Sequence, residues 1–230
     1  MKILNYLIII FICINPTVKA DSKKTLIDEL QKGGKLIFIR HAYAPGGGDP
    51  DNFDIKDCTT QRNLSDSGRV QSQKIGNFFK KNKISIGKVY SSEWCRCKET
   101  AKIAFKDYTT KSFLNSFYSS KFAKNKDKQV KALKEYIKNY KNNNNENLVL
   151  VTHYVLISEI LNYGSSSGEI VVSDKNFNII DTQEISYWIM SSKRAMKQAQ
   201  KQAYARHRSN ITNSRFGSRK KNFNKKNKKS

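Results

Sequence analysis

Three short runs of apolar residues stand out along the chain, each bounded by polar or glycine-containing stretches. They cover Leu36–Ile39, Val89–Ser91 and Leu148–Val151. Runs of this length, rich in large aliphatic and β-branched side chains, are typical of strands that are buried on both faces. The pattern therefore predicts three strands in the core of the protein.

Segments with helical spacing of apolar positions lie between these strands. In residues 66–82 the apolar side chains recur mostly on one side, and Ser65 can cap the first turn. The other predicted helices are Ser22–Lys32, ending at Gly33-Gly34, and Glu99–Phe105, Val130–Tyr140 and Tyr154–Leu161. Strands that alternate with helices predict an α/β fold with a largely parallel sheet. Residues 168–185 are predicted to form a closing hairpin with Lys175 and Asn176 in its turn.

The first twenty residues have the pattern of a secretory signal peptide. Lys2 gives a positive start, Ile3–Ile14 is apolar, and Pro16 and a final small residue, Ala20, follow. An uncleaved anchor helix is disfavoured, because the apolar run is short for a membrane span. We therefore expect a periplasmic or secreted protein, cleaved near Ala20.

Export would place the cysteines in an oxidising compartment. Removal of Cys13 with the signal peptide would leave Cys58, Cys95 and Cys97, so at most one intramolecular disulfide can form. A Cys95–Cys97 bridge is awkward in a helix, so Cys58 is expected to pair with one of the two. The spacing lacks the paired cysteines or histidines of a zinc site.

Positive charge is concentrated at the end of the chain. The formal net charge is +24, and residues 191–230 hold 14 Lys and Arg but no Asp or Glu. Residues 1–20 hold two more basic residues, which leaves 27 basic and all 19 acidic residues, a net charge of +8, on residues 21–190. This predicts one domain over residues 21–190 and a basic, disordered tail over residues 191–230.

Two of the three histidines occupy matching positions. Arg40 and His41 follow the first predicted strand directly, and His153 follows the third. Arg96 comes just after the second strand. Ligands bind beyond the carboxyl ends of the strands in such sheets, so we expect these side chains to converge on one pocket. A single histidine in such a position is usually structural, but two imidazoles and two guanidiniums together favour a phosphoryl-binding site.

Four segments, in order over about Leu36–Val172, resemble motifs of the histidine phosphatase superfamily, which has the phosphoglycerate-mutase-like fold. They are IRHAYAPGG, NLSDSGRVQSQKIG, VYSSEWCRCKETAKIA and LVLVTHYV. The usual glycine after the first histidine is Ala42 here. With the secretion signal, the chain looks closest to the small exported members, which include bacterial lipopolysaccharide core heptose phosphatases. The resemblance implies a three-layer sandwich with the sheet between helices.

The resemblance also implies roles for individual residues. His41 would be the nucleophile and form phosphohistidine, while Arg40, Arg96 and His153 would surround the phosphoryl oxygens. Arg62 is either a further substrate-binding contact or a solvated surface charge. No metal and no cofactor are implied. At the inner position held by Cys97 the family usually has Ala or Cys, so the implied disulfide joins Cys58 to Cys95.

The general acid for the leaving group is the part that the resemblance does not supply. Mutase-type members have a Glu in a segment that corresponds to Ser112–Asn125, which has no carboxylate here. Acid-phosphatase-type members have an Asp directly after the second histidine, where this chain has Tyr154. Glu169 and Glu93 are the remaining candidates, and mutase activity is disfavoured. The Pro45–Cys58 and Phe113–Lys128 loops, expected at the pocket entrance, carry no recognisable motif.

The sequence thus predicts an exported, metal-independent phosphatase that hydrolyses phosphomonoesters or pyrophosphates. Its expected partner is a phosphorylated small molecule or envelope glycolipid. One alternative is a degenerate family member that only binds a phosphate ligand. Another is a protein that binds anionic surfaces through residues 191–230. No specific nucleic-acid partner is expected.

Overall fold

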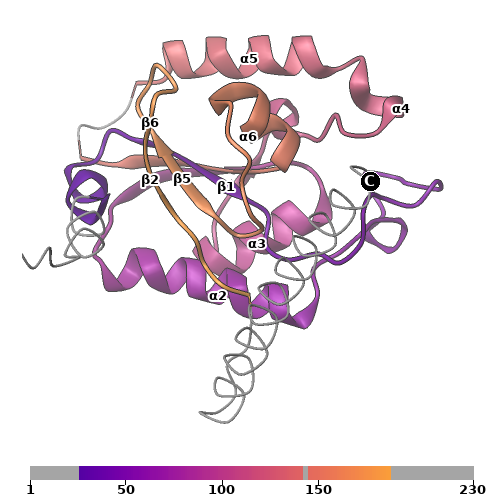
Figure 1. Ribbon diagram of the computed structural model, residues 1–230, viewed down its shortest axis with the longest axis horizontal. Coiled ribbons are helices and arrows are strands. Elements are labelled where there is room, and N and C mark those ends of the chain that lie inside the picture. The colour runs from indigo at the N-terminus through magenta and orange to yellow at the C-terminus, as the bar shows by residue number, and fades with distance from the viewer. Residues whose placement is uncertain (1–25, 142–144, 188–230) are drawn as a thin grey trace, which may run out of the picture. The chain divides into compact units, whose positions relative to one another are not determined.

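A six-stranded sheet forms the centre of the computed structural model, which describes residues 26–141 and 145–187 (Figure 1). The strand order is β3-β2-β4-β1-β5-β6. Neighbours from β3 to β1 are parallel, whereas β5 and β6 add to the edge next to β1 in antiparallel pairing. The strands are β1 (Leu36–Arg40), β2 (Ile86–Ser91), β3 (Thr109–Thr110), β4 (Asn147–Thr152), β5 (Ile170–Ser173) and β6 (Ile179–Gln183).

Helices cover both faces of the sheet. The longer ones are α2 (Asp66–Lys81), α3 (Cys95–Phe105), α5 (Lys126–Asn139) and α6 (Tyr154–Leu161), and residues 26–32 are also helical. Figure 1 shows α2 and α3 on one side of the strands and α5 and α6 on the other. Shorter elements are a helical turn, α4 (Ser120–Ala123), and 3-10 turns at Cys58–Thr60 and Ser112–Leu114.

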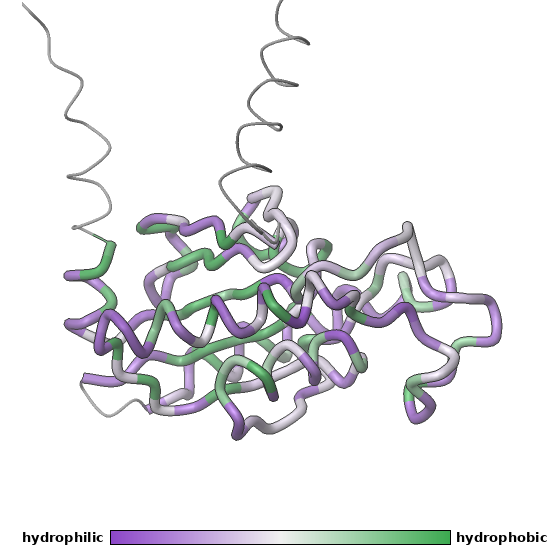
Figure 2. Tube along the Cα trace, turned by 90° about the horizontal axis from the view of Figure 1, so that it is seen from below, coloured by the Kyte–Doolittle hydropathy of each residue, from purple (hydrophilic) through white to green (hydrophobic). Residues whose placement is uncertain are grey.

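Alternation along the central strands explains why the fold has three layers. In β1, Ile37 and Ile39 pack with residues of α2, α3 and the helix at residues 26–32, whereas Leu36 and Phe38 pack with α5 and α6. Successive side chains of a strand point to opposite faces, so a strand that is apolar throughout needs a cover on both faces. In Figure 2 the hydrophobic colour accordingly runs along the central strands, between helices with hydrophilic outer turns.

The fold class and the principal elements agree with the sequence predictions. The three strands are present, the helix after Ser65 is capped by its hydroxyl, which accepts from the Gly68 N–H, and Lys175 and Asn176 lie in a turn. The helix at residues 26–32 ends before Gly33, whose φ of +73° favours glycine.

The predicted start of α3 was wrong. The helix begins at Cys95 rather than Glu99, so Arg96 lies in its first turn. The residue at its N-cap is Trp94, whose side chain makes no capping hydrogen bond, and the sequence therefore has no capping signal there. Helix α5 also begins earlier than predicted, at Lys126 rather than Val130. Its first turn is polar, so the spacing of apolar residues did not reveal it.

Some predictions fall on residues that the structure does not describe. Contacts divide the chain into Met1–Tyr187 and Trp188–Ser230, and the second unit lies wholly outside the described residues, as does the predicted signal peptide. The signal peptide and the basic tail stay predictions. In the described ranges, no helix has the length and apolar character needed to cross a membrane.

Candidate active site

A cavity of about 740 Å³ opens at the carboxyl ends of the central strands. Arg40 is the last residue of β1 and His41 follows it, His153 follows β4, and Arg96 enters from the first turn of α3. All four side chains line the cavity, and so does Arg62. The structure therefore brings together the five residues that the sequence analysis selected. Their catalytic roles stay predictions.

The hydrogen bonds of His41 determine which ring nitrogen carries the proton. Nδ1 lies 2.8 Å from the carbonyl oxygen of Ala42. A carbonyl oxygen can only accept, so Nδ1 must carry the hydrogen, and Nε2 of the neutral ring keeps its lone pair. Burial, reinforced by the positive charge of Arg96, holds the pKa of His41 well below its usual value. The result is a neutral imidazole with an unprotonated Nε2, as a nucleophile requires.

Arg96 joins this nucleophile to the rest of the site. Its Nε–H donates to Nε2 of His41 over 3.2 Å, and its guanidinium is almost completely buried. The two outer nitrogens, Nη1 and Nη2, donate to the two carboxylate oxygens of Asp49 at 2.6 and 3.2 Å. Asp49 thus holds the guanidinium in one orientation.

Two arginines that line the cavity each have one buried N–H group without a hydrogen-bond partner among the described residues. These groups are Nε of Arg40 and Nε of Arg62. The same guanidiniums are otherwise anchored, because Arg40 donates to the carbonyl of Ser165 at 2.7 Å and Arg62 donates to the carbonyl of Ala44. Both arginines line the cavity, and their guanidiniums place two positive charges there. The arrangement therefore suits a phosphoryl group.

His153 is a second neutral imidazole, and its proton is on Nε2. Ser92 Oγ donates to Oδ1 of Asn115 at 3.0 Å, so it must accept at its 2.9 Å contact with Nε2 of His153. Burial first, then the charge of Arg96, keeps the pKa of His153 well below its usual value. The ring centroids of His41 and His153 lie 5.4 Å apart. One phosphoryl group could contact both rings.

The two acids proposed from the sequence do not line the cavity. Glu169 accepts from the hydroxyl of Tyr163 and from the backbone N–H of Ser166, both at 2.6 Å. Glu93 accepts from the side-chain amide of Asn115 at 2.6 Å. Asp49 is instead the carboxylate among the described residues that line the cavity.

Asp49 is the site residue that sequence reasoning missed. It lies in the loop over residues 45–58, which showed no motif, and its partner Arg96 is 47 residues away. The loop holds four Asp residues, at positions 49, 51, 54 and 57, and nothing in the sequence distinguishes Asp49 from the others. Arg96 depresses the pKa of Asp49, which opposes the rise that burial would cause. The carboxylate is therefore ionised and paired with Arg96.

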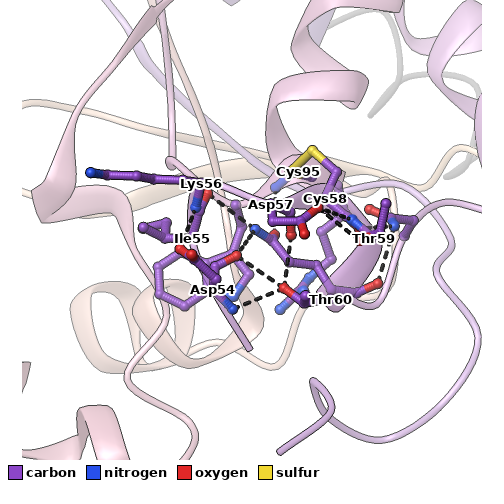
Figure 3. The surroundings of a disulfide bond; sticks show 12 residues. Asp54, Ile55, Lys56, Asp57, Cys58, Thr59, Thr60 and Cys95 are labelled. Carbon is purple, nitrogen blue, oxygen red and sulfur yellow. Dashed lines mark hydrogen bonds between the residues drawn. A yellow bond between two sulfur atoms is a disulfide. The ribbon is translucent and has the colours of Figure 1, made fainter. Parts of the chain in front are cut away.

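A disulfide between Cys58 and Cys95 closes this loop onto α3, as the resemblance implied (Figure 3). Figure 3 shows the hydrogen bonds of Asp54, Asp57, Thr59 and Thr60 that order the chain beside it. Cys95 immediately precedes Arg96, so the bridge anchors the end of the Asp49 loop next to the partner of Asp49.

Cys97 has a free, buried thiol close to His153. Its Sγ lies 3.4 Å from Nε2 of His153, and burial raises its pKa to about 12. It therefore stays a neutral thiol at physiological pH. Within the described ranges, no group of three or more His, Cys, Asp and Glu side chains could hold a metal ion.

Residues 36–113 match the family model of the histidine phosphatase superfamily (branch 1). Among similar solved structures is the protein histidine phosphatase SixA complexed with tungstate, with 15% identity, 65% of this chain and 96% of that chain covered, and a TM-score of 0.48. A mutant phosphoserine phosphatase from Entamoeba histolytica in complex with phosphoserine has 17% identity, coverages of 67% and 99%, and a TM-score of 0.49. Phosphoglycerate mutase from Thermus thermophilus has 14% identity, coverages of 66% and 99%, and a TM-score of 0.45. No curated protein sequence matches this chain.

Proposed function

We propose that this chain is a phosphatase that acts through a phosphohistidine at His41, a proposal supported by the match of residues 36–113 to the histidine phosphatase superfamily model. It would hydrolyse phosphomonoesters or pyrophosphates. The observation that carries the proposal is the Nδ1 hydrogen bond of His41 to the carbonyl of Ala42, which leaves Nε2 unprotonated inside a cavity with three guanidiniums.

The reaction would proceed in two displacements at phosphorus. In the first, Nε2 of His41 forms a bond to phosphorus as the bond to the leaving oxygen breaks, and the leaving group departs with that electron pair. The ring becomes cationic, and the Ala42 carbonyl, which accepts from Nδ1–H, stabilises it. In the second, water attacks phosphorus, the N–P bond breaks, and neutral His41 and inorganic phosphate result.

The arginines would supply most of the electrostatic stabilisation. The Nε–H of Arg96 bonds to Nε2 of His41, and this bond must break once that lone pair forms the bond to phosphorus. The N–H is then available to a phosphoryl oxygen at the moment when negative charge develops there. Arg40 and Arg62 also line the cavity and would add two positive charges beside the phosphoryl group. These cations neutralise the phosphoryl charge, so the route needs no metal ion.

We also propose that the enzyme works outside the cytoplasm on a phosphorylated small molecule or an envelope glycolipid. The signal-like pattern of residues 1–20 supports export, and so does the Cys58–Cys95 disulfide, since disulfides persist mainly in oxidising compartments. A lipopolysaccharide core heptose phosphate is one such substrate. A screen of envelope sugar phosphates, lipid pyrophosphates and phosphohistidine would identify the substrate class.

Turnover of p-nitrophenyl phosphate by the purified protein tests the central proposal. We expect hydrolysis that EDTA does not inhibit, and loss of that hydrolysis in His41→Ala. Activity that survives in His41→Ala would reject the phosphohistidine route. Activity lost in EDTA and restored by a divalent ion would reject the metal-independent route.

The cavity also favours one alternative function, that of a protein which binds a phosphate ligand without turning it over. Among the described residues that line the cavity, the carboxylate is Asp49, and it is paired with Arg96 rather than protonated. A site without a protonated acid hydrolyses poor leaving groups slowly. Tight phosphate binding by a protein that hydrolyses neither p-nitrophenyl phosphate nor a pyrophosphate would favour this alternative.

A further inference from the structure

The guanidinium of Arg96 has almost all of its N–H groups committed in the structure. Nε–H donates to His41, Nη1 donates to Asp49 and to the carbonyl of Arg62 at 3.3 Å, and Nη2 donates to Asp49. A guanidinium has five N–H donors in a fixed fork, so one Nη2 hydrogen is left. The paired outer nitrogens are the part of arginine that best fits two phosphate oxygens. Asp49 occupies that part.

Asp49 is itself held in place by groups other than Arg96. Its Oδ2 accepts from the indole Nε1–H of Trp94 at 3.0 Å, and its Oδ1 accepts from the backbone N–H of Arg62 at 3.1 Å. Trp94 is buried and stacks against Phe53 with ring centroids 5.0 Å apart. The position of the carboxylate is therefore set by Trp94 and by the backbone at Arg62, and Arg96 is oriented against a fixed anion.

The backbone around Asp49 supports the same conclusion. Gly46, three residues before it, has a φ of +98°, a conformation that side chains rarely adopt, and this lets the loop turn back over the cavity. At the other end of the loop, Cys58 is bonded to Cys95, the neighbour of Arg96. The disulfide thus fixes the far end of the loop relative to Arg96.

We propose that Asp49 is a positioning residue with two effects on the reaction at His41. It aims the Nε–H of Arg96 at Nε2 of His41, and it competes with the phosphoryl group for the outer nitrogens of Arg96, which weakens the binding of the phosphate product. The inference rests on the proposed phosphatase function, because it assigns a role in that reaction.

Opposite changes in turnover and in phosphate binding would be the signature of this role. In Asp49→Asn the guanidinium loses its fixed anion, so Nε–H is less well aimed, and kcat should fall by roughly 10- to 100-fold. Removal of one negative charge beside the bound anion, together with access to the fork of Arg96, should tighten the binding of inorganic phosphate about tenfold or more. Replacing a residue needed only for folding would lower kcat and also weaken the binding of phosphate.

Isothermal titration of the full chain with inorganic phosphate, alongside steady-state kinetics, tests the proposal. Asp51→Asn is the matched control: it removes the same charge from an exposed position two residues along the same loop, and it should change neither quantity. Asp49→Glu, which restores the carboxylate, should recover part of kcat and weaken phosphate binding again. Phosphate binding in Asp49→Asn that is unchanged or weaker, or an unchanged kcat, would overturn the proposal.

A comparison of two substrates separates positioning from proton donation. A misaimed Arg96 slows all substrates, so Asp49→Asn should lower kcat by the same factor for p-nitrophenyl phosphate and for glycerol phosphate. A much larger loss on glycerol phosphate, whose leaving group needs a proton, would make Asp49 the general acid and reject the proposal. If the wild-type protein hydrolysed neither ester, the proposed function would fail, while the phosphate titration would still decide whether Asp49 competes for Arg96.

Discussion

The Nε–H of Arg96 donates to Nε2 of His41 over 3.2 Å, and both side chains are almost fully buried. The bond joins the proposed nucleophile to the cation that would stabilise the developing charge. It also keeps His41 unprotonated at Nε2, because that nitrogen cannot accept from Arg96 and carry a proton at the same time.

Replacing this arginine by lysine should therefore be severe although the charge is kept. Arg96→Lys loses the Nε–H that faces His41 and the fork that binds Asp49, so we expect kcat for p-nitrophenyl phosphate to fall about 10²- to 10³-fold. Arg69→Lys, in a half-exposed ion pair with Glu99, is the control and should leave kcat unchanged. Similar rates for the Arg96 variant and wild type would contradict the role given to Arg96.

The phosphoenzyme itself can be trapped. Protein mixed with a radiolabelled phosphoryl donor and quenched in alkaline detergent should carry a label that is stable in alkali and lost in acid. Peptide mapping should place it on His41, and His41→Ala should not be labelled. An acid-stable label on a serine, or a label on His153, would show that the nucleophile has been misassigned.

Protonation of the two histidines should make stability depend on pH. The pKa of each is held well below 6.5 in the folded protein, by burial and then by Arg96. Between pH 6.5 and the lower folded pKa values, the unfolded chain binds protons that the folded protein does not. The free energy of unfolding should therefore be level above pH 6.5 and fall below it, by about 1.4 kcal/mol per pH unit for each histidine.

Urea titrations at pH 7.5, 6.5 and 5.5 measure this slope. His41→Asn removes one of the two groups and should roughly halve it. Asp49 and Asp174, whose pKa values are also lowered, lose their stabilising charge only at more acidic pH, near and below 3.8, so they do not contribute in this window. A free energy of unfolding that stayed constant down to pH 5.5 would mean that the histidines are charged in the folded protein.

Position explains which parts of this site could be predicted from the sequence. The two apolar strands must be buried on both faces, and the residues that directly follow their apolar parts are Arg40, His41 and His153. The sequence therefore places these residues at one edge of the sheet without any knowledge of side-chain contacts. The superfamily match over residues 36–113 includes Arg96 and His41 but not His153, which the fold brings alongside them.

Asp49 could not be predicted in the same way, for a physical reason. Its role depends on where a glycine-containing loop folds, and that is set by Trp94, Phe53 and a disulfide rather than by any local periodicity. The start of α3 was missed for a related reason, because Trp94 occupies the N-cap without a capping hydrogen bond. Glu93 and Glu169 were plausible acids in sequence, but neither lines the cavity, and each accepts a hydrogen bond from another side chain.

The disulfide should matter for stability and can be tested chemically. Peptide mapping without reductant should give one Cys58–Cys95 peptide and an unmodified Cys97, which has a pKa of about 12 and should not react with thiol reagents at pH 8 until the protein unfolds. The double variant Cys58→Ser with Cys95→Ser should lose about 2–4 kcal/mol of unfolding free energy. Reductant should lower the unfolding free energy of the wild-type protein to that of the variant, and it should leave the unfolding free energy of the variant unchanged. A Cys58–Cys97 peptide would reverse the assignment.

The final prediction concerns residues 191–230, which carry 14 Lys and Arg and no Asp or Glu. We propose that they hold the enzyme at anionic envelope surfaces, where each basic residue can contribute up to about 1 kcal/mol, within a Debye length of about 8 Å at physiological salt.

The proposed chemistry uses none of these residues. Truncation after Met190 should therefore leave hydrolysis of p-nitrophenyl phosphate nearly unchanged. The same truncation should weaken binding to anionic vesicles or lipopolysaccharide, and added salt should have the same effect on the full chain. Equal binding by the truncated and full-length proteins, or loss of activity on the soluble ester, would show that these residues have a different role.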